Sequence, residues 1–282
     1  MTNWPAELRS RAVRSPRTRP HLDRVRRRTA AFRPLPDFVV LGAQKAGTTF
    51  LFHQLCRQPA VSPPISKEIH HFDEGRADGV AAYRSAFPTM LSRRVMSGSD
   101  AITGECTPSY LYFDWVAAEM AEVVPRAQLV AVIRDPVARA YSHYWHSRAR
   151  GEETLSFEDA CRAEGDRLSS DPRSGPDALR SHRSWSYQDR GKYVTQIRRY
   201  HEHFGTDRLL VVTSDALRRT PDEVMERVCA HVGTPFVRRC EETRRHQRSY
   251  PPMDPRTRGR LEEMFDPWND ELERHLGVSL PW

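Results

Sequence analysis

The sequence predicts an α/β fold, a P-loop-like parallel sheet with helices on both faces. Two observations indicate this fold: three short apolar runs show no alternation with polar residues, and each run precedes a segment with helical spacing. Strands that are apolar throughout are typical of parallel sheets covered on both faces. The 282 residues are enough for one large domain with a sizeable core.

The first apolar run, residues 38–41, ends at Gly42, and helical spacing begins at Thr48. This order predicts a strand, a glycine loop and a helix. Ligands of parallel sheets bind beyond the carboxyl ends of the strands. The loop that begins at Gly42 is therefore the first candidate for a binding site.

The other two apolar runs, residues 129–133 and 209–212, also precede expected helices. The former ends at Arg134 and leads into a helix that begins near Val137. The latter leads into a helix with a capping box, in which Thr220 is the N-cap residue. Between these two runs, a stretch rich in Ser, Arg, Asp, Gly and Pro predicts a long surface loop, over residues 164–191.

The net charge of +7 is concentrated near the N-terminus. Residues 1–36 hold ten arginines and two acidic residues, whereas the other 246 residues hold 34 basic and 35 acidic ones. Because prolines are interleaved with the arginines, we expect a poorly ordered basic arm, followed by one domain over residues 37–282. A solvated extension is the simpler interpretation of the arm; attraction to a polyanion or a membrane surface is the alternative.

No run approaches 18 consecutive apolar residues, and no apolar stretch accompanies the N-terminal arginines. We therefore expect neither a membrane span nor a secretory signal, and a cytoplasmic location. Only three of the basic residues are lysines, Lys45, Lys67 and Lys192, which suggests a GC-rich bacterial genome. The five cysteines form no C-x-x-C pair, so neither a disulfide framework nor a zinc site is indicated.

The glycine loop has the composition of an anion site. Gly42-Ala43-Gln44-Lys45-Ala46-Gly47-Thr48-Thr49 contains the two glycines of G-x-x-x-x-G, and backbone N–H groups in such a loop cradle phosphates. A nucleotide triphosphatase needs lysine directly after the second glycine, where this chain has Thr48. Lys45, inside the turn, suits charge neutralisation on the oxygen between a 5′-phosphate and its leaving group. The alternative is an ordinary helix start with an incidental lysine.

A second anion contact is expected where the strand over residues 129–133 ends. Arg134 offers a guanidinium fork for a phosphate dianion, and Ser142, two helical turns later, adds a hydroxyl. A structural salt bridge between Arg134 and Asp135 is the alternative.

Two histidine pairs have spacings that could bind a metal ion, but no cysteine or acidic cluster accompanies either pair in the sequence. We interpret them as solvated helix faces and expect no metal; the pairs are His143 with His146 and His201 with His203. Three nearby aromatic residues either pack their helix or line an acceptor cleft: Tyr141, Tyr144 and Trp145.

With both phosphate-binding segments in view, the sequence resembles the sulfotransferases that use 3′-phosphoadenosine 5′-phosphosulfate (PAPS). The resemblance is greatest to the branch that contains heparan sulfate N- and O-sulfotransferases and their bacterial relatives, and it covers about residues 37–282. It implies the sulfotransferase fold, PAPS as the donor and no metal requirement.

The resemblance also implies roles for particular residues. The 5′-phosphosulfate would be held by Lys45, Ala46, Gly47, Thr48 and Thr49. The 3′-phosphate would be held by Arg134 and Ser142, and the loop near the C-terminus that closes over the nucleotide would add Arg248.

The segment Lys67-Glu68-Ile69-His70-His71-Phe72-Asp73 resembles the one that supplies the general base, which falls on Glu68. His70 would lie beside the acceptor as a catalytic or substrate-binding group, and Lys67 and Lys192 would be further substrate contacts. For Glu68 the alternative is a surface carboxylate paired with Lys67, and for His70 it is a structural histidine.

Two departures from the family pattern concern the acceptor and the closing loop. Glycan-acting relatives often have lysine before Thr-Pro, where this chain has Cys106 before Thr107-Pro108. Gln247 stands where a glycine is usual in the late loop.

These observations predict a sulfotransferase that moves a sulfuryl group from PAPS to a hydroxyl or amine of a glycan or small-molecule acceptor. A P-loop kinase or NTPase is one alternative. A polyanion-binding protein that acts through the arginine-rich arm is the other. We expect neither nucleic acid nor a membrane span to be involved.

Overall fold

The computed structural model describes residues 19–74, 79–97, 101–238 and 250–282. Its centre is a four-stranded parallel sheet with the strand order β2-β1-β3-β4. All three apolar runs are strands, so the predicted α/β class and parallel sheet are confirmed. The strands are β1 (Phe38–Gly42), β2 (Gly104–Cys106), β3 (Gln128–Ile133) and β4 (Leu209–Thr213).

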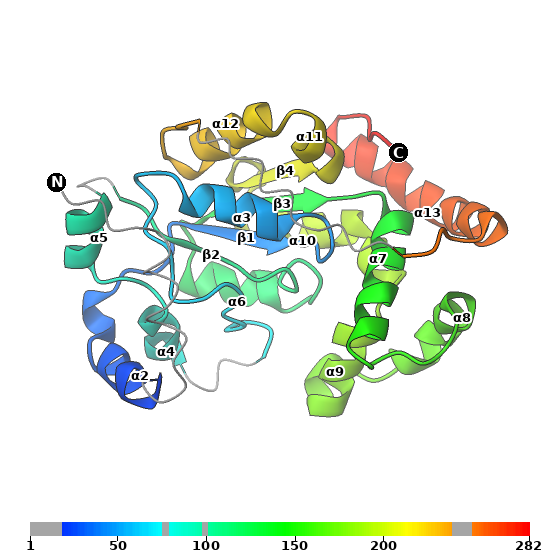
Figure 1. Ribbon diagram of the computed structural model, residues 1–282, viewed down its shortest axis with the longest axis horizontal. Helices are drawn as coiled ribbons and strands as arrows, with labels where there is room; N and C mark the ends of the chain where they lie inside the picture. Colours follow the sequence, from blue (N-terminus) through cyan, green and yellow to red (C-terminus); the bar gives the residue numbers. More distant parts are fainter. Residues whose placement is uncertain (1–18, 75–78, 98–100, 239–249) are drawn as a thin grey trace.

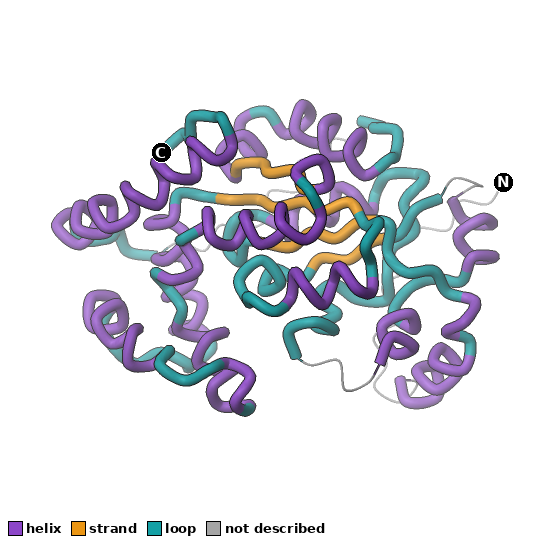
Figure 2. Tube along the Cα trace, turned by 180° about the vertical axis from the view of Figure 1, so that it is seen from behind, coloured by secondary structure: helices purple, strands orange, loops and turns teal. Residues whose placement is uncertain are grey.

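Helices cover both faces of the sheet, as Figures 1 and 2 show from opposite sides. One face is covered by α3 (Thr48–Cys56), α11 (Ser214–Arg219) and α12 (Pro221–Val232). The other face is covered by α6 (Val116–Val123) and α10 (Tyr193–Phe204). β1 and most of β3 are fully buried, which explains why these strands are apolar at every position.

A second group of helices extends from the edge where β3 ends (Figure 1). These are α7 (Pro136–Ala149), α8 (Phe157–Arg167), α9 (Pro176–Trp185) and α13 (Pro255–Leu276). They enclose a smaller apolar cluster around Val137, Tyr144, Phe157 and Phe265. Near the opposite end lie α2 (Arg19–Arg28), the 3-10 turn η1 (Ala30–Phe32), α4 (Gly79–Ser85) and α5 (Met90–Ser97).

The prediction of a long surface loop over residues 164–191 is wrong. This stretch contains the end of α8, the whole of α9 and the 3-10 turns η3 (Pro172–Ser174) and η4 (Asp189–Gly191). Its polarity is misleading because polar groups hold it together: the buried Glu164 carboxylate accepts the backbone N–H groups of Gln188 and Asp189 at 2.7–2.9 Å. Ser184 and His182 of α9 are buried despite their polarity.

The arginine-rich arm is also more structured than expected in the part that the structure describes. Helix α2 begins at Arg19, and Arg26 donates to the carbonyl oxygens of Ser85 and Phe87 at 2.6 and 2.8 Å. Arg33 donates to the same Phe87 oxygen at 2.5 Å. These guanidinium groups therefore dock the segment on α4, and the domain boundary at residue 36 stays a prediction.

Two helix starts follow their sequence signals, with one difference. Asp135 caps α7 through its side chain, which accepts the N–H of Val137 at 2.9 Å. Thr220 precedes α12 as expected and Pro221 is its first residue, but the Thr220 side chain makes no capping hydrogen bond. The predicted capping box is therefore wrong in its hydrogen bond, although its position is right.

Gly42 closes β1 at a point where the backbone passes very close to its neighbours. A Cβ atom there would lie 2.8 Å from both Leu111 Cβ and the Pro108 carbonyl oxygen. We expect Gly42→Ala to lower the free energy of unfolding by about 2–3 kcal/mol, since neither contact can rotate away. Gly165→Ala is the matched control: a Cβ there meets open space within helix α8, so stability should rise by roughly 0.5–1 kcal/mol. Thermal unfolding of both variants checks this, and equal midpoints would contradict it.

Candidate active site

The loop between β1 and α3 presents unused hydrogen-bond donors beyond the end of the strand. Among the described residues, the backbone N–H groups of Gly47, Thr48 and Thr49 find no acceptor. Lys45 holds a left-handed backbone conformation with φ of 69°, and the buried Ala46 donates its N–H to Ala43 at 3.1 Å. Three free amides at the N-terminus of a helix form an anion site.

Arg134 reaches this loop from the end of β3. Its Nη1 donates to the carbonyl oxygen of Lys45 at 3.1 Å. The alternative salt bridge with Asp135 is wrong, because Asp135 caps α7 and also lies 3.8 Å from Arg258. Within the described ranges Arg134 forms no ion pair, so its charge is available to a ligand.

Ser142 lies two turns into α7 and is half-buried. The junction of β3 and α7 therefore carries both residues predicted to hold a 3′-phosphate. The third predicted contact, Arg248, and the unusual Gln247 lie outside the described residues.

The segment that follows them, residues 250–254, lies against α7. Tyr141 donates its hydroxyl to the Pro251 carbonyl at 2.9 Å, and the Tyr250 ring stacks on Trp145 with 6.0 Å between centroids. Tyr144 donates to the Leu155 carbonyl within the smaller apolar cluster. The three aromatic residues of α7 thus pack their surroundings, and none of them lines the cleft described below.

Residues 67–74 are held in place by the chain that leaves β2. The N–H of Glu68 donates to the Cys106 carbonyl at 3.0 Å, and the N–H of Ile69 donates to Thr107 Oγ1 at 3.1 Å. The N–H of His71 donates to the Tyr110 hydroxyl at 2.9 Å. The backbone of residues 68–71 is thus hydrogen-bonded to the end of β2 and to the residues that follow it. Because the glycine loop follows the neighbouring strand β1, these hydrogen bonds hold the two segments in a fixed relation.

Glu68 is 45% exposed and lies between two cations. Its carboxylate accepts a hydrogen bond from Lys67 and lies 3.8 Å from Nε2 of His70. The contact with His70, aided by Lys67 and opposed by partial burial, lowers the pKa of Glu68 to about 2. The alternative pairing of Glu68 with Lys67 is therefore present, and the role of Glu68 as general base stays a prediction.

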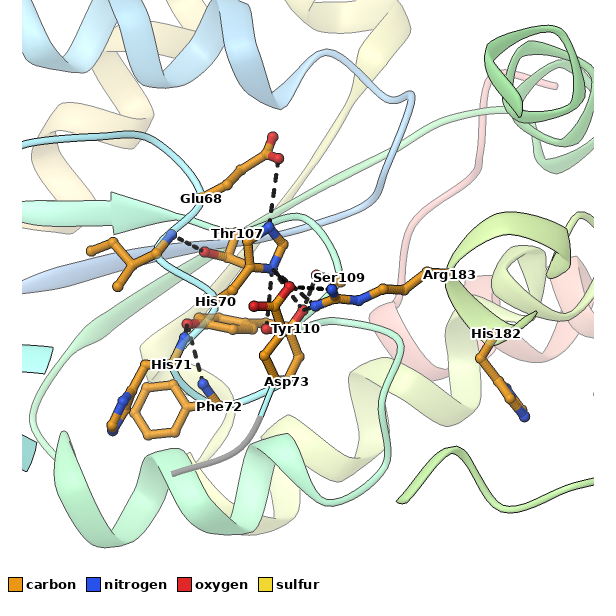
Figure 3. Close-up of polar contacts among 12 residues, drawn as sticks. Glu68, His70, His71, Phe72, Asp73, Thr107, Ser109, Tyr110, His182 and Arg183 are labelled. Atoms are coloured by element: carbon orange, nitrogen blue, oxygen red, sulfur yellow. Dashed lines mark hydrogen bonds and ion pairs between the residues drawn. The ribbon is translucent and has the colours of Figure 1, made fainter. Parts of the chain in front are cut away.

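A buried carboxylate holds His70 (Figure 3). Oδ2 of Asp73 lies 3.0 Å from Nδ1 of His70 and accepts hydrogen bonds from Ser109 and from Nη2 of Arg183, the latter at 2.8 Å. Burial and the nearby charge of Arg183 disfavour the imidazolium, but the hydrogen bond with Asp73 and the nearby Glu68 carboxylate outweigh them and raise the pKa of His70 to about 9. His70 is therefore a cation at neutral pH, and Arg183, from the distant helix α9, shares its counter-ion.

The residues just described open onto a cleft of about 920 Å³. One wall comes from residues 68–74 and 108–119, and the other comes from α7, α9 and the turn before α9. Gln44 of the glycine loop lies at the edge of the cleft. The lining includes Glu68, His70, Asp73, Ser109, Trp115, His143, Arg183 and Arg190.

Of the three predicted substrate contacts, His70 lines the cleft, whereas Lys67 and Lys192 are not among its lining residues. Lys67 contacts the Glu68 carboxylate, and Lys192 lies elsewhere. Its Nζ lies 3.0 Å from Asp189 and 5.5 Å from the Trp268 ring centroid, on the side of α10 that faces α13. The interpretation of His143 as solvated is wrong, because it is buried and its Nε2 donates to the Arg183 carbonyl at 3.1 Å. His201 contacts His275 of α13 at 2.9 Å. Over the described residues, no group of three potential metal ligands gathers.

Sequence reasoning missed Ser109 and Arg183 as site residues and quoted Asp73 only as part of a motif. Ser109 and Asp73 are 36 residues apart, and Asp73 and Arg183 are 110 apart. Asp73 could have been found only from its position three residues after His70, in the segment for which catalysis was predicted.

The chain was compared with known protein families, curated proteins and solved structures. A family model described as "Sulfotransferase domain" matches residues 35–254, more than half of the chain. The chain belongs to the sulfotransferase domain family. PAPS-dependent sulfuryl transfer is the general function of that family.

Similar curated proteins include the bovine (Bos taurus) bifunctional heparan sulfate N-deacetylase/N-sulfotransferase 2, 28% identical over 88% of this chain. Human (Homo sapiens) heparan sulfate glucosamine 3-O-sulfotransferase 3B1 is 26% identical over 88% of the chain. The matched region spans 30% of the former protein and 65% of the latter. A sulfotransferase crystal structure from Alicyclobacillus acidocaldarius superposes with a TM-score of 0.66 at 26% identity, covering 87% of this chain and 97% of that one.

No helix among the described residues is long and apolar enough to cross a membrane. The four cysteines that the structure describes are free thiols.

Proposed function

We propose that residues 37–282 form a sulfotransferase that moves a sulfuryl group from PAPS to a hydroxyl or amine of a glycan or small-molecule acceptor. The observation that carries the proposal is one juxtaposition. Free amides at Gly47–Thr49 and an unpaired Arg134 lie at the carboxyl ends of β1 and β3, beside a cleft that displays Glu68.

In this proposal the glycine loop holds the 5′-phosphosulfate. The amides of Gly47, Thr48 and Thr49 donate to its oxygens. Ala46 lies in the buried turn before them, and its small side chain leaves the approach of the phosphosulfate open. Lys45 stabilises the negative charge on the departing 5′-phosphate oxygen. Arg134 braces the loop and, with Ser142 and Arg248, holds the 3′-phosphate.

Glu68 accepts the proton of the acceptor in an in-line displacement. A bond forms between the acceptor oxygen or nitrogen and sulfur, the bond from sulfur to the bridging 5′-phosphate oxygen breaks, and the electron pair stays on that phosphate. A carboxylate held near pKa 2 is a weak base in the free protein. It suffices if the proton leaves late, because the attacking atom becomes acidic as its bond to sulfur forms.

Lys67 and His70 supply the positive charge that the relatives' second lysine would give. Cys106, at that lysine's position, is completely buried, and burial raises the pKa of its thiol to about 12, so the thiol is neutral. Lys67 and His70 instead flank the Glu68 carboxylate, which in this proposal lies beside the transferred group. Lys192, which immediately precedes α10, pairs with Asp189 and does not line the cleft, so it is not part of this set.

The direct test is release of adenosine 3′,5′-bisphosphate from PAPS in the presence of acceptors and excess EDTA. Pools of heparan-type oligosaccharides and of hydroxylated small molecules serve as acceptors, and chromatography of the labelled products identifies the one that is used. Acceptor-dependent release without a metal supports the proposal. Release that requires magnesium, or transfer of phosphate from ATP, contradicts it.

The pH dependence of turnover tests the role of Asp73. With the pKa of His70 near 9, His70 is protonated below that pH and loses its charge above it, so turnover should fall as the pH rises through about 9. Asp73→Asn removes the carboxylate that raises this pKa, so the fall should begin at a lower pH. Unchanged binding of adenosine 3′,5′-bisphosphate shows that the variant is folded. A high-pH limb at the wild-type position would contradict the assignment.

A further inference from the structure

Helix α5 directs two polar side chains toward the protein and three apolar ones toward solvent, the reverse of an ordinary surface helix. On its inner side, Nη2 of Arg93 lies 3.0 Å from the Asp37 carboxylate, and Oγ of Ser97 lies 3.0 Å from Oγ of Ser62. On its outer side, three large apolar side chains are 67–77% exposed: Met90, Leu91 and Val95. The inner contacts fix the orientation of α5, so the exposure is built into the fold.

The exposed residues of α5 form one continuous face. At 3.6 residues per turn, Met90, Leu91, Arg94 and Val95 fall within an arc of roughly 140° around the helix axis. Arg94 is exposed like its apolar neighbours. This face is therefore a short apolar stripe that carries one positive charge.

Exposed apolar side chains are concentrated at this end of the molecule. Among the described residues, seven large hydrophobic side chains are exposed, and five of them belong to α2, η1 and α5: Val25, Phe32, Met90, Leu91 and Val95. The other two are Val237 and Val278. They lie outside α2, η1 and α5, and they are far apart in the sequence. Such a concentration on a water-soluble domain indicates a surface that another body covers.

Positive charge accompanies the apolar residues. Helix α2 exposes Arg24, Arg27 and Arg28, and the hydrogen bond from Arg26 to the Phe87 carbonyl ties α2 to the chain three residues before α5. Figures 1 and 2 show α2 and α5 at the same end of the molecule, opposite α8 and α9.

We propose that this end docks on an anionic lipid surface. In this proposal the docking surface, named the α2–α5 face, comprises the exposed side chains of α2, η1 and α5: the apolar residues Val25, Phe32, Met90, Leu91 and Val95 and the arginines Arg24, Arg27, Arg28 and Arg94. Apolar side chains enter the boundary between headgroups and acyl chains, while arginines pair with lipid phosphates. The inference goes beyond the proposed function and does not depend on it.

Two other occupants fit the face less well. A second copy in a two-fold dimer would place the same arginines against one another without an acidic partner. Nucleic acid would satisfy the arginines, but its phosphate backbone offers nothing to side chains such as Leu91 and Val95, which are 73% and 77% exposed. An anionic lipid surface offers phosphates to the arginines and an apolar layer to the exposed apolar side chains.

The test is co-sedimentation of the full chain with vesicles of phosphatidylcholine alone and of phosphatidylcholine with phosphatidylglycerol. We expect binding to the anionic vesicles that weakens with salt. The double variant Leu91→Asn, Val95→Asn should bind at least about tenfold more weakly, since it removes two apolar insertions without a change in charge. The triple variant Arg24→Gln, Arg27→Gln, Arg28→Gln should lose about a hundredfold, because each arginine near an anionic surface is worth about fivefold.

Val278→Asn is the matched control, because Val278 is 52% exposed but lies beyond α13; it should bind as the wild type does. All substituted side chains are exposed, and unfolding midpoints confirm that the variants fold. Equal binding of the Leu91→Asn, Val95→Asn variant and the wild type would overturn the proposal. So would self-association in size-exclusion chromatography that the double variant abolishes without any vesicle binding, since the face would then join two copies.

Discussion

Glu68→Gln should lower turnover by about a hundredfold or more while binding of adenosine 3′,5′-bisphosphate stays unchanged. Glutamine keeps the shape of the side chain but cannot accept a proton from the acceptor. Its effect should fall on kcat, because Glu68 lines the cleft and its carboxylate contacts Lys67 and His70, which are not part of the glycine loop. Initial rates with saturating donor measure the change.

Glu74→Gln is the matched control for this prediction. Glu74 belongs to the same segment, lines the same cleft and is 49% exposed against 45% for Glu68, but it pairs with Arg183. Its loss should reduce turnover by less than about tenfold, as for an exposed ion pair. Equal rates for the two variants would remove Glu68 from the role of general base.

Arg134→Ala should weaken the binding of adenosine 3′,5′-bisphosphate by about a hundredfold or more. A guanidinium that makes two charge-assisted hydrogen bonds to a phosphate accounts for that loss. The same variant also removes the brace on the Lys45 carbonyl. Arg134→Lys, which keeps the charge without the fork, should bind with intermediate affinity.

The control for Arg134 lies near the other end of the same strand. Arg126 is exposed and precedes β3, whereas Arg134 follows it. Calorimetric titration of Arg126→Ala should give the wild-type affinity. Retention of wild-type affinity by Arg134→Ala would place the 3′-phosphate elsewhere.

The sheet and its loop could be predicted because their physical causes are local. β1 and β3 must be apolar at nearly every position since both faces are covered, and Gly42 must be glycine since the backbone passes Leu111 and Pro108 too closely for a Cβ. Such constraints act on consecutive residues and can therefore be recognised in a short stretch of sequence. The same reasoning located Arg134 correctly, because a strand end is a local feature.

The second half of the candidate site depends on contacts between distant parts of the chain. Asp73 accepts hydrogen bonds from Ser109 and Arg183 while it holds His70, and the sequence around Asp73 does not indicate either partner. Arg183 was missed for a further reason. Helix α9 lies in a stretch whose polarity predicted a loop, because polar residues such as His182 and Ser184 occupy buried positions of this helix that are usually apolar. Lys192 does not line the cleft, and the sequence could not show this, because the start of a helix does not reveal which neighbours a side chain contacts. Here the side chain contacts Asp189 and Trp268.

The most direct test of the central claim is calorimetric titration of the wild-type chain with three ligands. These are adenosine 3′,5′-bisphosphate in EDTA, adenosine 5′-monophosphate in EDTA, and ATP with magnesium. The account predicts tight binding of the bisphosphate without a metal, and at least about tenfold weaker binding of the monophosphate, which lacks the group assigned to Arg134. Preference for ATP with magnesium would contradict it, and would mean that the glycine loop serves a phosphotransferase.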